Sequence, residues 1–239
     1  MSAQRDFGLC LLRVIACYLV IQVHTSLKAE DFLLSTPNTS LLLEANKDKS
    51  LHLQYYGTRI ESSSEGYNSG TALWQLAYPS FGIETWTEIS HQEKKSVMLY
   101  YFPSASIPFR PGKYYLSHLH GAWATETQLS EEELLPGVKI IKNKDGVRNA
   151  QTDNPSLMLS VGQEPSENSG AVFGATLIWS GNYELKIDTD HYRRSRLFAG
   201  INPDASQYTL MPGEIFQTPP MAMTYSIEGK GGVSRNFHR

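Results

Sequence analysis

The stretch GAVFGATLIWSGNYELKID, residues 170–188, holds two apolar segments on either side of a Ser-Gly-Asn turn. Short runs that are rich in β-branched and aromatic residues and bounded by Gly or Asn favour β-strands. A Gly-Asn pair between two such runs favours a hairpin, because both residues tolerate the left-handed backbone of a tight turn. The stretch therefore predicts two adjacent antiparallel strands.

Runs of the same kind recur along the chain from Leu41 onward. They are separated by Gly, Pro and Asn, and the clearest are LHLQYYG, SVMLYYF, KYYLSHL, GVKIIKNKDG, PSLMLSVG, QYTLMPGEIFQTP and MAMTYSI. The one helical signal is SEEELL, residues 130–135, where a capping Ser precedes Glu133 and a Pro-Gly pair closes the segment. The sequence predicts an all-β fold, a large antiparallel β-sandwich with few short helices.

Composition places the chain among globular proteins. Of its 239 residues, 41% are hydrophobic and 19% are charged, and the net charge is −3. Lys and Arg are scattered, so the chain has no basic face for binding nucleic acid. We expect one domain over residues 30–239.

The first 29 residues differ from the rest, with Arg5 near the start and an apolar run from Val14 to Val23. This pattern predicts an export signal that is cleaved after Ala29, and the run is too short to span a bilayer. A lipoprotein reading of the same segment is the weaker alternative. Both cysteines lie inside the segment, so the mature chain would have no thiol for catalysis, zinc binding or a disulfide.

Two histidines in SHLHGAW, residues 117–123, are one residue apart. On a strand, His118 and His120 would point the same way, as a pair of zinc ligands does. The other histidines offer no spacing that completes a metal site. We expect both to lie on a solvated sheet face, and we expect neither a metal nor a cofactor.

Acidic residues offer two candidate catalytic pairs. Glu84 and Glu88 would share one strand face with Trp86, and Asp188 and Asp190 are two residues apart. Paired carboxylates can hydrolyse glycosides when their separation suits a nucleophile or a water. Acids on one strand face are more often a solvated surface, so no catalytic residue is assigned. A serine-nucleophile elbow, a P-loop and a dinucleotide fingerprint are all absent from the sequence.

Four motifs together resemble the N-terminal domain of family 36 glycoside hydrolases, the bacterial-type α-galactosidases. They are Gly121–Trp123, Ser180–Asn182, Gly200–Pro203 and Leu210–Pro219. The resemblance implies a β-supersandwich that precedes a (β/α)8 barrel, in which a full-length retaining enzyme carries both catalytic aspartates and hydrolyses terminal α-galactosides. The chain would then be a fragment that is non-catalytic by itself, and SHLHGAW would be a strand leading into a packed Gly-Ala-Trp corner.

The resemblance carries further expectations. The partners would be α-galactoside oligosaccharides, which the full enzyme would bind. A homo-oligomer would be compatible with the family, and no membrane contact is expected after signal cleavage. The protein would be exported, to the periplasm of a Gram-negative bacterium. Related chains have several strands between the parts that match LAYPSFG and IETWTEISH, whereas here Gly82 is followed directly by Ile83. We therefore expect an internal deletion near residues 82–83.

Two other functions stay open at this point. The first is a stand-alone carbohydrate-binding β-sandwich module, with Trp74, Trp86 and Trp123 as candidate sugar platforms. The second is a structural export protein that has no ligand.

Overall fold

A computed structural model describes residues 30–35, 39–45, 51–58, 83–91, 93–146, 152–204 and 206–238. The predicted signal, Trp74 and Gly82 lie outside these residues. The chain divides into two compact units, Met1–Phe81 and Gly82–Arg239, each of which is described by itself. The single domain over residues 30–239 and the deletion near residue 82 stay predictions.

The first unit contains a three-stranded antiparallel sheet. Its strands pair in the order β1-β2-β3, and their bounds are β1 (Glu30–Ser35), β2 (Thr39–Ala45) and β3 (Leu51–Thr58). Leu42 of β2 is fully buried. The LHLQYYG run thus forms β3, as its pattern predicts.

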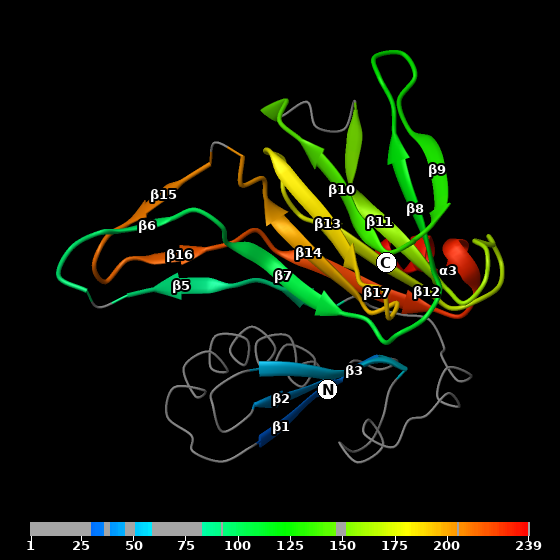
Figure 1. Cartoon of the computed structure of the whole chain (residues 1–239), viewed down its shortest axis with the longest axis horizontal. Helices are drawn as coiled ribbons and strands as arrows, with labels where there is room; N and C mark the ends of the chain where they lie inside the picture. Colours follow the sequence, from blue (N-terminus) through cyan, green and yellow to red (C-terminus); the bar gives the residue numbers. More distant parts are fainter. Residues whose placement is uncertain are drawn as a thin grey trace, which may run out of the picture. The chain divides into compact units, whose positions relative to one another are not determined.

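The second unit is a sandwich of two antiparallel sheets (Figure 1). The six-stranded sheet has the order β4-β17-β12-β11-β8-β9, with bounds Ile83–Thr85, Met221–Ser226, Val172–Leu177, Asp153–Val161, Tyr114–His120 and Gln128–Glu133. The four-stranded sheet has the order β10-β13-β14-β7, with bounds Gly137–Asn143, Tyr183–Thr189, Ser195–Ile201 and Pro103–Pro108. The predicted all-β sandwich is confirmed. The hairpin predicted within residues 170–188 is wrong: the stretch does form two strands, but β12 pairs with β11 and β17 in one sheet and β13 pairs with β10 and β14 in the other, so the turn between them crosses from sheet to sheet.

Alternation along the strands builds the core between the two sheets. β11 contacts both β10 and β13 across the sandwich. The six-stranded sheet contributes the fully buried Leu116, Leu159 and Leu177, and the four-stranded sheet contributes Tyr183 and Leu185. Because side chains on a strand alternate between faces, one face of each sheet forms this core while the other stays outside.

A narrow arm extends from the sandwich (Figure 1). It consists of two antiparallel ribbons, β5 (Glu88–Ser90) with β16 (Ile215–Gln217) and β6 (Val97–Leu99) with β15 (Tyr208–Leu210). The ring centroid of Phe216 lies 4.5 Å from that of Tyr208 and 4.9 Å from that of Phe102. These aromatic contacts hold the arm together, because two-stranded ribbons alone are only marginally stable.

Helix α3 (Gly229–Phe237) follows β17 and packs on the outer face of the six-stranded sheet, against β17, β12 and β11. Gly174 of β12 makes this contact possible: a Cβ there would lie 2.3 Å from Val233 Cγ1 and 2.9 Å from Phe237 Cε2. The sequence pattern did not predict this helix, because its glycines are poor helix formers and its stability comes from the sheet.

The helix predicted for residues 130–135 is wrong, because Gln128–Glu133 forms strand β9 at the edge of the six-stranded sheet. Its glutamates find partners on neighbouring elements. Glu131 accepts a hydrogen bond from Ser117, Glu132 pairs with Lys139, and Glu133 pairs with both Lys113 and Arg193. Pairing with β8 therefore outweighs the local capping signal, and the charges suit an exposed edge strand.

Candidate functional site

Loops from both sheets meet at one end of the sandwich (Figure 1). We call it the loop end; it comprises residues 121–127, 143–146, 178–182 and 202–204. Asn182 accepts a hydrogen bond from the backbone N–H of Gly146 at 2.8 Å, and its carbonyl accepts one from the N–H of Asn202 at 3.2 Å. Asn202 in turn donates to the carbonyl oxygen of Asn143 at 3.1 Å. The Ser180–Asn182 and Gly200–Pro203 motifs thus connect the loops to one another through hydrogen bonds.

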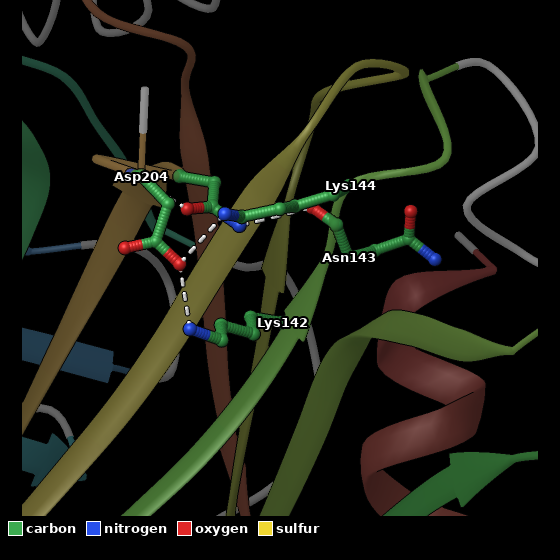
Figure 2. Close-up of polar contacts among 5 residues, drawn as sticks. Lys142, Asn143, Lys144 and Asp204 are labelled. Atoms are coloured by element: carbon green, nitrogen blue, oxygen red, sulfur yellow. Dashed lines mark hydrogen bonds and ion pairs between the residues drawn. The ribbon is translucent and has the colours of Figure 1, made fainter. Parts of the chain in front are cut away.

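Two lysines and one aspartate extend this network at the surface. Lys142 Nζ and Lys144 Nζ lie 2.7 Å and 3.1 Å from Asp204 Oδ2, and Figure 2 shows both ammonium groups directed at that carboxylate. Hydrogen bonds from Lys142 and then Lys144 lower the pKa of Asp204. The cluster ties the end of β10 to the loop after β14.

Trp179 lies beside the turn that connects β12 to β13. Its Nε1 donates to the carbonyl oxygen of Asn182 at 3.1 Å, and a Cβ on Gly181 would lie 2.7 Å from the same nitrogen. The indole is 40% exposed. Trp179 is not among the platform candidates predicted from the sequence, because WSGN is typical of a turn; its position at the start of that turn was the available signal.

Trp123 is 83% exposed, so the predicted packed Gly-Ala-Trp corner is wrong. The residue sits in a turn closed by a hydrogen bond from Thr125 N to Ala122 O at 2.9 Å. Ala124 and Thr127 adopt φ of 64° and 60°, which costs side-chain-bearing residues on the order of 1–3 kcal/mol each. The strained turn holds a large aromatic ring in solvent.

The other two platform candidates are less suitable. Trp86 is half-buried, and its Nε1 donates to Glu88 Oε1 at 3.2 Å. Trp74 lies outside the described residues. Trp123 is therefore the candidate with the most accessible ring.

The histidine pair is divided by burial. His118 lies in the sandwich and is 8% exposed, whereas His120 at the end of β8 is exposed, with ring centroids 5.9 Å apart. The expectation that both lie on the surface is thus wrong for His118, because their shared face is the core face. Burial, and then the nearby Lys139 charge, lower the pKa of His118. No group of three His, Cys, Asp or Glu side chains that could hold a metal occurs in the part of the chain that the structure describes.

The candidate catalytic acids have separate structural roles. Glu84 lies in β4 and Glu88 in β5, and these strands pair with different partners, so they do not form one strand face. Asp188 is exposed opposite Arg196 in the neighbouring strand.

Asp190 belongs to the turn after β13. It accepts hydrogen bonds from the backbone N–H groups of Tyr192 and Arg194, at 2.8 and 2.9 Å, and pairs with Arg194 Nε at 2.7 Å. These contacts, the Arg194 backbone N–H first, lower its pKa. The acid thus stabilises the local turn.

The fold and these loops define an all-β sandwich domain with a hydrogen-bonded loop end. Residues 75–211 match the sequence model of the Glycosyl hydrolase family 36 N-terminal domain, and the chain belongs to this family. Among the described helices, none has both the length and the apolar character needed to cross a membrane.

Curated relatives match over part of their length. Alpha-galactosidase AgaA of Geobacillus stearothermophilus is 36% identical over 135 residues, which are 56% of this chain and 18% of AgaA. Alpha-galactosidase 2 of Pediococcus pentosaceus is 31% identical over 154 residues, 64% of this chain and 21% of that protein. The chain thus spans about a fifth of these relatives.

Solved structures share the fold. The crystal structure of GH36 α-galactosidase AgaA from Geobacillus stearothermophilus aligns with a TM-score of 0.72 at 18% identity, covering 87% of this chain and 42% of that one. A doubly substituted AgaA in complex with raffinose aligns with a TM-score of 0.73 at 19% identity and the same coverage.

Proposed function

We propose that this chain acts as the accessory N-terminal domain of an α-galactosidase and does not hydrolyse glycosides by itself. Family membership over residues 75–211 carries the proposal. The relatives at 36% and 31% identity are α-galactosidases, and related crystal structures hold raffinose and stachyose. Hydrolysis of terminal α-galactosides would be performed by a catalytic barrel, whose pocket the sandwich helps to shape.

Complementation tests this proposal. The portion of AgaA outside the region matched by this chain is expressed separately, and its hydrolysis of an aryl α-galactoside and of raffinose is measured with and without the 239-residue chain. We expect the chain to raise the rate or the thermal midpoint of the catalytic portion. An unchanged rate and midpoint at saturating chain would contradict the accessory role.

The arm supports a further part of the proposal, a contribution to contacts between subunits. Its exposed side chains include Tyr100 at 64% and Ile215 at 64%, together with Met98, Tyr101 and Met211. Large apolar side chains grouped on a projecting element are typical of interaction surfaces. Sedimentation velocity on wild type and on Ile215→Lys tests this, with dissociation to a smaller species expected for the variant.

A second candidate function is a carbohydrate-binding module. The strained turn that presents Trp123 in solvent favours it, because an exposed indole can stack on the C–H face of a sugar. Titration with raffinose or melibiose, followed by tryptophan fluorescence, separates the two functions. Saturable quenching that Trp123→Ala removes and Trp86→Phe retains would favour the module.

Export to a bacterial periplasm belongs to the same proposal, on the apolar run that ends near Ala29. N-terminal sequencing of the mature protein should begin near Glu30. Recovery of the intact chain from the cytoplasm, starting at Met1, would contradict it.

A further inference from the structure

Strand β8 enters the loop end with two histidines, and the first of them is buried. His118 is 8% exposed, and its Nδ1 has no hydrogen-bond partner among the residues that the structure describes. The exposed ring of His120 lies 5.9 Å away, measured between ring centroids. Buried polar atoms are nearly always paired, so a buried imidazole nitrogen without a partner indicates a role beyond packing.

Charged groups face His118 from each strand that packs around it. β9 contributes Glu132, β10 contributes Lys139, β11 contributes Asp153, and β8 itself contributes His120. Burial and then Lys139 lower the pKa of His118, and Asp153 and Glu132 oppose them only in part. The neutral imidazole is therefore the form that the folded core favours. His118 also lines a groove beside helix α3, whose other titratable groups are Glu167, Lys230 and His238.

The pairing of β8 with β11 is irregular at the same place. His118 lies opposite Leu157 and His120 lies opposite Asp153, so a step of two residues in β8 faces a step of four in β11. A bulge of this kind leaves part of the ladder unpaired. Because fewer backbone hydrogen bonds hold this end of β8, opening it costs less free energy than opening the rest of the sheet.

The turn that follows this weak pairing stores backbone strain. Ala124 and Thr127 have positive φ, and Trp123 stands beside them in solvent. The N–H of Gly121 donates to the carbonyl oxygen of Thr152 at 2.7 Å, which anchors the turn to the start of β11. A strained segment persists only while its surroundings hold it in place. Loss of this anchor would let the turn relax and release the indole from its fixed position.

We propose that His118 is a pH-sensitive switch, whose protonation in mild acid opens the end of β8 and releases the turn that presents Trp123. A charged imidazole needs solvation that the core does not supply, and opening places the ring in water. A proton on His120, 5.9 Å away, adds repulsion between the two rings. The open form takes up the proton first, so acid favours the open form and neutral pH favours the closed one.

The properties of a free imidazole limit the size of the response. With a pKa of about 6.5 in the open form and no proton uptake in the closed form, the open population rises at most about thirtyfold between pH about 7.5 and about 5. The device concerns the turn itself, so it holds for either function proposed above.

Hydrogen exchange followed by mass spectrometry tests the switch on the 239-residue chain. Exchange is measured at both pH values and divided by the intrinsic rate at each pH, which gives protection factors for two segments. Residues 117–127 report on the switch. Residues 161–165 are the matched control, because they contain no histidine and leave the opposite end of β11, where Gly162 N–H donates to the Lys113 carbonyl at 2.8 Å. The same measurements are made on His118→Gln and His120→Gln, whose folding circular dichroism checks.

In wild type and His120→Gln, acid should lower the protection of residues 117–127 by about tenfold or more, and that of residues 161–165 by less than about twofold. His118→Gln should keep the protection of residues 117–127 nearly constant, because a neutral amide takes up no proton. Equal falls in both segments, or no fall in wild type, would overturn the proposal. A fall that persists in His118→Gln, or that His120→Gln abolishes, would assign the response to another group and overturn it as well. If His118→Gln does not fold, the two segments of wild type and His120→Gln still decide.

Discussion

Substitution of Gly174 tests how helix α3 is seated. In Gly174→Ala, the new Cβ would lie 2.3 Å from Val233 Cγ1, 2.9 Å from Phe237 Cε2 and 3.2 Å from Thr224 Cγ2. Val233 is fully buried, so it cannot turn away into solvent. Overpacking of this kind costs about 1–3 kcal/mol. For a domain of this size each kcal/mol lowers the melting temperature by about 2–4 °C, which predicts a decrease of about 2–12 °C.

Urea unfolding followed by tryptophan fluorescence measures the effect as a shift in midpoint. Gly112→Ala is the control, because its Cβ would meet only the Tyr114 ring at 3.6–3.8 Å; this variant should be neutral or slightly more stable. Combining Gly174→Ala with Val233→Ala should cost less than the sum of the single changes, because the second substitution removes the nearest obstructing methyl. If Gly174→Ala is as stable as wild type while Gly112→Ala behaves as expected, the close seating of α3 is wrong.

Further predictions concern the core and the titrating groups. Leu159→Ala should lower the free energy of unfolding by about 2–5 kcal/mol in chemical denaturation, because Leu159 is fully buried. Burial lowers the pKa of His118 in the folded state, so the unfolded state takes up the proton first and stability should fall as the pH drops below about 6.5; His118→Gln should flatten urea midpoints between pH about 7.5 and 5. The lowered pKa of Asp190 gives a contribution that is present above the unfolded pKa of about 3.9 and is lost as the pH falls through the folded value; Asp190→Ala should reduce the stability difference between pH about 5 and 2.

Strand patterns in the sequence predicted the fold class well. KYYLSHL, PSLMLSVG and MAMTYSI became β8, β11 and β17, because each is a run of apolar residues that a sandwich can bury on one face or both. A turn is also present at WSGN, but it carries the chain from β12 in one sheet to β13 in the other and does not close the predicted hairpin. Individual strands and turns depend on the properties of residues that are neighbours in the sequence, so they can be predicted from it.

Features that depend on tertiary pairing could not be predicted in this way. Residues 130–135 carry a helix-capping pattern, yet they pair with β8 because cations on neighbouring elements neutralise their glutamates. Helix α3 forms from a glycine-rich segment because those glycines permit close contact with the sheet. The same limit applies to the candidate site: period-two alternation placed His118 and His120 on one face, but it could not tell that this face is the core.

The hydrolytic rate of the isolated chain tests the central claim most directly. The purified 239-residue protein is incubated with an aryl α-galactoside, and release of the aryl group is compared with a buffer blank. Retaining hydrolysis requires a nucleophile and an acid/base carboxylate at a matched separation, and Glu84, Glu88, Asp188 and Asp190 occupy separate strands or a turn. We expect a rate equal to background. Turnover above background that Glu84→Gln or Asp188→Asn abolishes would contradict the proposed role as a non-catalytic accessory domain.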